Sequence, residues 1–255
     1  MKKALENLIP FAVGAVLVAG VIFLLRWSFK KEADKAIKTI QTTPLYSDTA
    51  QIGRTYKFIG KINASSPVEL PGKREKVVWG YFSLTALYGN FDGLATQNVY
   101  CYAEAGKDIF LKTGTGKKLP IYFGEPVSFN KGCSDEVYNE TKIYLPVAET
   151  ILSDKQPEEV EYTVTNDDPT TMRRDYKVRY GNDEFTFYHE QIKLKDEGVE
   201  IIKKYILPDS DVVIIGTLTE EGIKGTPENP VKIYVGTEEE VLAKLKEKSE
   251  KMVAH

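Results

Sequence analysis

The sequence predicts a mainly β protein. We expect a small barrel-like or sandwich-like antiparallel domain with an N-terminal transmembrane helix and a short C-terminal helix. Three observations predict this: an uncharged apolar run near the N-terminus, a series of short strand-like runs, and a charged amphipathic segment at the end. The expected divisions are 1–38 for the anchor and juxtamembrane helix, 39–236 for the β-rich domain, and 237–255 for the C-terminal helix.

The predicted membrane segment runs from Leu8 to Leu25 and contains no charged residue. Its eighteen residues would rise about 27 Å as a helix. Arg26 and Trp27 follow at interface depth. A cleaved signal peptide is the alternative, but the run is long for one and no small-x-small cleavage site follows it. We therefore predict a retained single-pass anchor in the cell membrane, in contact with the lipid bilayer. The residues that we predict to anchor the chain in the bilayer are Leu8, Phe11, Val16, Phe23, Leu25, Arg26 and Trp27.

The orientation of the anchor depends on the lysines and arginines at its two ends. Lys2 and Lys3 precede the run, and five basic residues follow it: Arg26, Lys30, Lys31, Lys35 and Lys38. Because the more basic flank stays in the cytoplasm, this bias predicts a cytoplasmic domain. Beyond the bilayer, Ala33, Ala36, Ile37 and Ile40 recur at helical spacing, so the helix should continue until Pro44 ends it.

The β-rich region consists of short runs rich in Val, Ile, Tyr, Phe and Thr, separated by Gly, Pro, Asn and Asp. Gly60 and Gly216 stand inside two of these runs, where glycine usually marks a bulge or a bend. The predicted strands are Tyr56–Ile62, Val77–Tyr88, Asn98–Ala103, Ile109–Lys112, Ile121–Phe123, Lys142–Leu145, Glu159–Thr165, Asp175–Tyr180, Glu184–Tyr188, Asp211–Thr219 and Val231–Val235.

The C-terminal segment has the pattern of a short amphipathic helix. Thr237 and Glu240 stand at the spacing of a capping box, and Val241, Leu242 and Leu245 form one apolar stripe. We expect this helix to pack on the sheet.

Composition and charge limit the chemistry. With 34 Lys and Arg against 37 Asp and Glu, the net charge of −3 gives no basic excess for nucleic acid. The cysteines, Cys101 and Cys133, are too few for a disulfide-rich scaffold, although they could form one disulfide in an oxidising compartment. Together with His189 and His255 they do not make a convincing zinc site, so no metal and no cofactor is expected.

Catalytic motifs are missing as well. Lys112–Lys118 resembles a phosphate loop but has the wrong glycine spacing, so we interpret it as a hairpin turn. His189 has no Gly-x-Ser-x-Gly nucleophile motif to act with, and the acidic pairs Asp167-Asp168 and Asp209-Asp211 lie beside prolines, as turn residues do. We therefore predict no catalytic residue and no enzyme. A cluster of aromatic residues from Trp79 to Tyr102 indicates core packing or, as an alternative, a binding patch.

Two blocks of the sequence resemble the GIDE domain, also called "beside a membrane" (BAM), of membrane-anchored proteins. The first comprises Ile40–Pro44, Gly53, Gly60, Ser66-Pro67 and Val77–Tyr81; the second comprises Lys204–Gly216 and Gly236–Glu240. The family includes mitochondrial ubiquitin ligases and prokaryotic relatives without a RING, and the present chain looks like the latter. The resemblance implies that the domain faces away from the cytosol, in conflict with the charge bias.

Ligase activity does not follow from the resemblance, because the chain has no zinc-binding RING after the domain. Lys76-Val77 stands where the family has a cysteine before the aromatic strand, and Asn98–Lys155 has no counterpart. The sequence therefore predicts a membrane-anchored β domain that binds a partner or a ligand at the bilayer surface. The alternatives are a structural subunit of an oligomer or filament built through the apolar helix, and an enzyme or ligase-accessory subunit.

Overall fold

The computed structural model describes residues 2–72, 75–90, 93–124, 138, 140–144, 149–152, 160–168, 173–189 and 195–251. The chain forms two compact units. A helical unit joins the two ends of the sequence, 1–44 and 238–255, and a β unit comprises 45–237.

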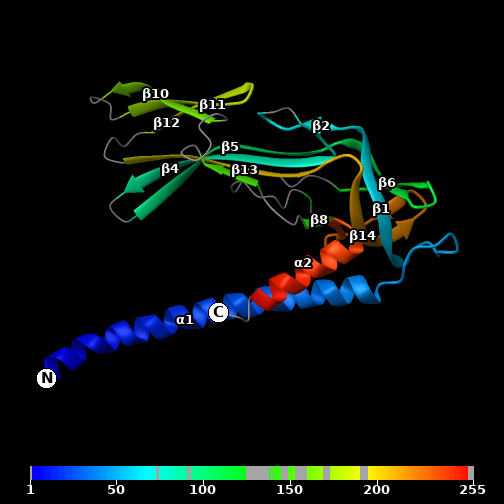
Figure 1. Cartoon of the computed structure of the whole chain (residues 1–255), viewed down its shortest axis with the longest axis horizontal. Helices are drawn as coiled ribbons and strands as arrows, with labels where there is room; N and C mark the ends of the chain where they lie inside the picture. Colours follow the sequence, from blue (N-terminus) through cyan, green and yellow to red (C-terminus); the bar gives the residue numbers. More distant parts are fainter. Residues whose placement is uncertain are drawn as a thin grey trace. The chain divides into compact units, whose positions relative to one another are not determined.

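The helical unit consists of α1 (Lys2–Thr42) and α2 (Glu238–Lys251). The prediction of one helix through residue 38 is confirmed, and α1 ends two residues before Pro44, where proline disfavours helical backbone. Figure 1 shows α2 running back along α1 in the opposite direction. The expectation that the C-terminal helix packs on the sheet is wrong, because the structure groups α2 with α1 instead.

The contact between the helices uses the predicted stripe of α1. Ala33 and Ile40, seven residues apart and therefore on one face, are buried at 4% and 0% exposure. In α2 the buried residues are Val241 and Ser249, and the Ser249 hydroxyl donates a hydrogen bond of 2.7 Å to Asp34 Oδ1. The apolar stripe on α1 gives α2 a place to pack, which the pattern of α2 alone does not reveal.

Among the described residues, no helix meets the length and hydropathy required of a membrane span. Four of the predicted anchor residues have side chains outside the described set: Leu8, Phe11, Val16 and Phe23. The other three are described. Leu25 and Trp27 are 54% and 56% exposed, and Arg26 is half-buried.

The β unit contains sixteen strands among the described residues. Seven of them form the largest sheet, in the order β7-β6-β1-β14-β16-β8 with β15 also paired to β14. Their bounds are β1 Thr55–Ser66, β6 Lys107–Thr113, β7 Lys118–Pro120, β8 Thr141–Tyr144, β14 Ser210–Thr219, β15 Gly222–Lys224 and β16 Val231–Val235.

This sheet closes on itself. The amide of Ile121, just after β7, donates to Ile109 O of β6 at 2.8 Å, and the next amide, that of Tyr122, donates to Ile223 O of β15 at 3.0 Å. Hydrogen bonds therefore run in a circuit through β1, β6, the Ile121 segment, β15 and β14. Phe58, Leu111 and Ile214 are among the side chains that fill this small barrel, each at 1% exposure or less.

The remaining strands form smaller sheets. One has the order β5-β4-β13-β9, one has β10-β11-β12, and β2 pairs with β3. A second core joins strands of these sheets, with Phe82, Leu84, Val178 and Ile201 wholly buried. The bounds are β2 Val68–Glu69, β3 Lys76–Val77, β4 Trp79–Asn90, β5 Gly93–Ala105, β9 Glu149–Leu152, β10 Val160–Asp168, β11 Arg173–Tyr180, β12 Asp183–His189 and β13 Lys195–Ile206.

Most predicted strands are confirmed, and the differences have physical reasons. Ile121–Phe123 makes only an isolated bridge at Ile121. β13 was missed because its charged residues hide the alternation, and Asp167-Asp168 ends β10 rather than forming a turn. No bulge occurs at Gly60 or Gly216 in the pairing of β1 with β14. Close packing explains Gly60, since a Cβ there would lie 2.2 Å from Lys112 O.

Candidate functional site

A cavity of about 900 Å³ lies on the barrel where its sheet closes. We call it the barrel cavity. Its described lining comes from the ends of β1 and β5, the hairpin of β6 and β7, the segment after β7, residues just before β8, and β15. The lining residues are Ser65, Ala105, Gly106, Asp108, Ile109, Phe110, Lys118, Pro120, Ile121, Tyr122, Phe123, Gly124, Tyr138, Glu140 and Lys224. Its size is that of a small-molecule site.

Two lysines lie over aromatic rings in this lining. Lys118 Nζ is 4.7 Å from the ring centroid of Phe110, and Lys224 Nζ is 4.4 Å from that of Tyr122. Contacts of this kind hold an ammonium group near an apolar wall. Lys224 also pairs with Glu221, and this hydrogen bond raises the pKa of Lys224. The cavity thus combines aromatic walls with fixed positive charge.

Carboxylates balance these lysines. Asp108 has a φ of 47°, a left-handed conformation that is uncommon outside glycine, and its Oδ2 accepts a 2.7 Å hydrogen bond from Ser65 Oγ. Glu140 lies beside Gly124, whose φ is +82° and whose Cβ, if present, would fall 2.7 Å from Glu140 Cβ. Burial raises the pKa of Tyr138 above its ordinary value. The lining of the cavity thus carries charged groups of both signs beside aromatic rings.

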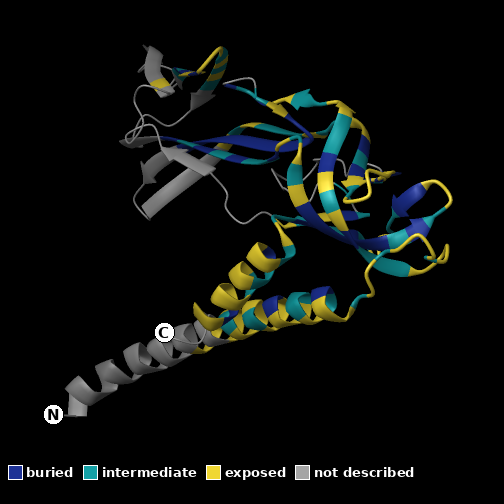
Figure 2. Cartoon of the chain, turned by 45° about the vertical axis from the view of Figure 1, so that its right-hand side comes forward, coloured by how far each residue is buried: buried dark blue, intermediate teal, exposed yellow. Residues whose placement is uncertain are grey.

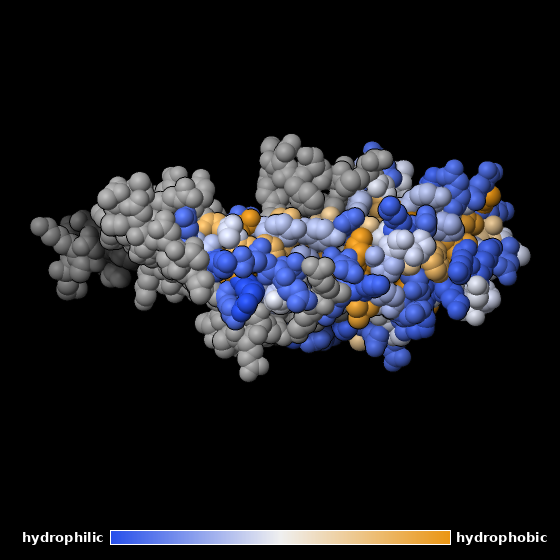
Figure 3. Space-filling view, turned by 90° about the horizontal axis from the view of Figure 1, so that it is seen from above, coloured by the Kyte–Doolittle hydropathy of each residue, from blue (hydrophilic) through white to orange (hydrophobic). Residues whose placement is uncertain are grey.

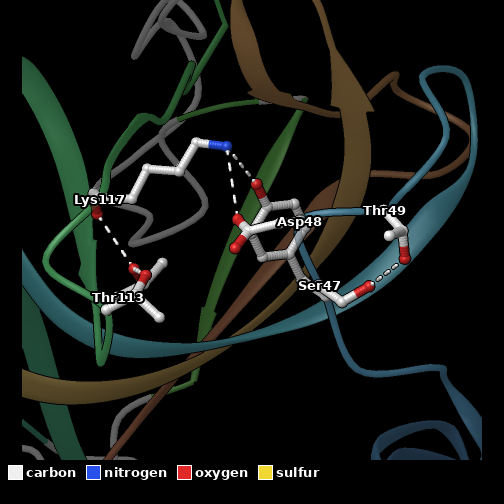
Figure 4. Close-up of polar contacts among 7 residues, drawn as sticks. Ser47, Asp48, Thr49, Thr113 and Lys117 are labelled. Carbon is white, nitrogen blue, oxygen red and sulfur yellow. Dashed lines mark hydrogen bonds and ion pairs between the residues drawn. The ribbon is translucent and has the colours of Figure 1, made fainter.

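The chain that follows α1 is tied to the same β6–β7 hairpin (Figure 4). Lys117 Nζ donates a 2.7 Å hydrogen bond to Tyr46 OH and lies 3.9 Å from Asp48 Oδ1. The Tyr46 ring lies 5.0 Å from that of Phe58 in the barrel core. The predicted hairpin turn at Lys112–Lys118 is confirmed, since the Thr113 amide donates to Lys117 O at 2.9 Å. These contacts hold the segment that leads into β1 against the β6–β7 hairpin.

A buried lysine lies in the second core of the β unit. Lys203 on β13 is 2% exposed, and its Nζ lies 3.4 Å from Glu75 Oε2. The rings of Tyr180 and Tyr205 lie 5.8 Å and 5.6 Å from the same nitrogen. An ion pair together with aromatic faces accounts for a charge at this depth, so a structural role explains it.

The helical unit carries exposed large apolar side chains near the end of the predicted span. Figure 2 shows the described part of α1 largely exposed, whereas the barrel strands carry many buried positions. In the view of Figure 3, the described surface is mostly hydrophilic, with hydrophobic atoms in separate small patches. The exposed apolar residues of α1, which we call the apolar band, are Val21 56%, Leu24 62%, Leu25 54%, Trp27 56% and Phe29 44%.

The other residues that the sequence singled out are partly described. Cys101 on β5 is disulfide-bonded, while Cys133, its predicted partner, lies outside the described residues. The side chain of His189 and all of His255 also lie outside them, so the prediction that no catalytic residue exists stays a prediction. In the aromatic cluster, Trp79, Tyr81 and Phe82 are buried core residues, as expected.

Sequence reasoning missed the barrel cavity. Lys118 and Lys224 stand in unremarkable charged surroundings in the sequence. They line one cavity because the segment after β7 meets β15, where Ile121 bridges Ile223. No local spacing signals such a contact.

Comparisons of the chain with protein-family models, with curated proteins and with solved structures found no significant match. The resemblance to the GIDE domain therefore stays a prediction. Its second block falls on the end of β13, the turn at Asp209 and β14, an ordinary strand–turn–strand unit in which Asp209 has a φ of 61°.

Proposed function

We propose that this protein is a single-pass membrane protein whose β unit binds a partner or a ligand at the bilayer surface. The apolar band on α1 is the observation that carries the proposal. The barrel cavity is the binding site that we assign to the β unit.

The apolar band favours a lipid environment over water. At 3.6 residues per turn, its five positions spread over roughly 200° of the helix circumference. A helix that packs on one protein surface shows a narrower stripe of about 100°. Leaving one large apolar side chain fully in water costs about 1.5–3 kcal/mol. These five side chains are about half exposed, so a lipid environment would stabilise each of them by roughly half that amount. The eighteen uncharged residues that end at Leu25 continue the same character toward the N-terminus.

The barrel cavity supports binding rather than catalysis. Its lysines are held by Phe110, Tyr122 and Glu221. Of its described carboxylates, Asp108 on β6 accepts a hydrogen bond from Ser65, and Glu140 lies beside Gly124. No described histidine or cysteine lines it. A protein of this kind would display a ligand site close to the membrane.

The test is membrane extraction of the full chain. Expressed in cells and washed in alkaline carbonate, the parent should stay in the membrane pellet with its N-terminal residues intact by mass. A double substitution at the middle of the run, Val13→Asp with Val16→Asp, should release it, because each central carboxylate costs about 2.5–3.5 kcal/mol of insertion.

The matched control is Val13→Leu with Val16→Leu, which preserves hydropathy and should stay in the pellet. Release of the parent by carbonate, or loss of residues 1–25 from the mature chain, would overturn the proposal. A parent that is released but elutes as a large oligomer would instead favour the structural-subunit alternative, in which the apolar helices pack together.

A further inference from the structure

We infer that α2 and α1 together form a cationic collar that binds the headgroups of anionic lipids. The collar comprises Arg26, Lys30 and Lys31 of α1 with Lys248 and Lys251 of α2. This inference rests on the proposed anchor and adds a lipid class and a role for the C-terminal helix.

The contacts within the helical unit place α2 beside the predicted membrane boundary. Lys248 Nζ lies 5.9 Å from the ring of Phe29, and Ser249 is hydrogen-bonded to Asp34. Phe29 is four residues beyond Leu25, a rise of about 6 Å. The headgroup layer on each side of the hydrocarbon is roughly 5–8 Å thick. The ammonium of Lys248, which reaches the ring of Phe29, therefore lies at headgroup depth, whereas the backbone of α2 at Ser249, level with Asp34, lies about 13 Å beyond Leu25.

The direction of α2 carries its basic end toward the bilayer. Because α2 runs antiparallel to α1 (Figure 1), Lys251 lies about 4.5 Å closer to the membrane than Lys248. The acidic first turn, Glu238–Glu240, is at the opposite end. Its distance from Lys248 is about 12–15 Å along the helix, more than the Debye length of about 8 Å at physiological salt.

The basic residues of the collar have features of a membrane interface. Lys31 Nζ lies 5.1 Å from the ring of Trp27, so a cation accompanies an exposed indole. Tryptophan and lysine together are typical of headgroup depth, where the ring meets the apolar layer and the ammonium meets phosphate. Lys251 is 73% exposed despite its ion pair with Glu247 and remains open to a phosphate. Glu32, Asp34, Glu247 and Glu250 stand among the five basic residues of the collar, so the net charge there is +1. This small positive excess, together with the exposure of Lys251, favours anionic headgroups as the occupant.

The experiment measures amide hydrogen exchange of α2 in the full chain, reconstituted in nanodiscs. One set of discs contains phosphatidylcholine only, and the other contains 30% phosphatidylserine. A basic residue at the surface of an anionic membrane contributes roughly fivefold in binding. Because α2 contributes two lysines to the collar, the α2 amides of the parent should exchange up to about 25-fold more slowly in the anionic discs. High salt should remove the difference.

Lys248→Gln with Lys251→Gln should remove most of that slowing when its exchange in anionic discs is compared with its own exchange in phosphatidylcholine discs, a ratio that cancels the loss of the Lys251–Glu247 ion pair and of the Lys248–Phe29 contact. Protected α2 amides in the phosphatidylcholine discs show that the helix still folds. The control variant, Lys76→Gln with Lys112→Gln, removes the same charge from the β unit. It should retain the slower exchange of α2 in the anionic discs. Equal exchange of the parent in both kinds of disc overturns the collar alone. Failure of the parent to enter any disc overturns the anchor, and the collar with it.

Discussion

The helical unit and the β unit differ in how far their large apolar side chains are exposed. In the barrel, Phe58, Ile62 and Ile214 are at most 1% exposed, whereas on α1 Leu24 and Leu25 are 62% and 54% exposed. The residue types are alike, so the difference lies in what surrounds them. The β unit supplies its own apolar environment, whereas the helical unit leaves its apolar band exposed among the described residues.

This contrast shows where each part derives its stability. A closed sheet satisfies its backbone hydrogen bonds and fills its interior with side chains from several strands. A long helix satisfies its own backbone but cannot cover its own side chains. Substitutions in the two units should therefore have different consequences, and the expected effects below run from the largest to the smallest.

The largest effect is expected from a cavity in the barrel core. Phe58→Ala should lower the free energy of unfolding of the β unit by about 3–5 kcal/mol, because Phe58 is wholly buried beside Tyr46. Leu25→Ala should leave it unchanged. Urea unfolding in detergent, followed by Trp79 fluorescence in a Trp27→Phe background, measures both. A loss of similar size from Leu25→Ala would break the contrast between the units.

A smaller effect is expected where strands approach too closely for a side chain. Gly60→Ala would set a Cβ 2.2 Å from Lys112 O, so strands β1 and β6 must separate. We expect a loss of about 1–3 kcal/mol in the same urea measurement. Gly114→Ala in the neighbouring hairpin meets no atom within 4 Å and serves as the control. Equal stability of the two variants would show that β1 can move freely.

A polar substitution tests whether the second core depends on its ion pair. Glu75→Gln removes the counter-ion that lies 3.4 Å from buried Lys203, and we expect a loss of about 1–2 kcal/mol, reduced because Glu75 is itself 34% exposed. Lys203→Met should cost less, since the remaining carboxylate can reach water. We expect the urea midpoint of Glu75→Gln to lie below that of Lys203→Met. The reverse order would contradict this account of Lys203.

The smallest effect is expected in the helical unit. Ser249→Ala removes a 2.7 Å hydrogen bond to Asp34, which is worth about 1 kcal/mol between the helices. Amide exchange in α2 should become roughly fivefold faster, while the urea midpoint of the β unit stays at its parent value. A change in the β unit of similar size would mean that the two units are not independent.

Much of the fold was predictable because it depends on local pattern. The continuous helix through residue 38, its end before Pro44, the hairpin at Lys112–Lys118 and the strand at Val231–Val235 were all predicted from apolar spacing and turn residues. Such features need only neighbouring residues. β13 escaped prediction because its lysines, including Lys203, occupy strand positions that a pattern assigns to solvent.

The candidate site was not predictable in the same way. Asp108, Lys118 and Lys224 come from separate strands, and nothing near any of them in the sequence indicates the others. Their proximity depends on the bridge between Ile121 and Ile223 that completes the barrel.

By itself, the sequence determined which segments are helical, where most of the strands lie, and that residues 8–25 carry no charge. These properties depend on residue type and on spacing over a few residues. Only the tertiary structure decided that the sheet closes, that Lys203 is buried between two tyrosines, and that α2 pairs with α1 rather than with the sheet. These outcomes depend on contacts between residues far apart in the chain, whose energies no local pattern contains.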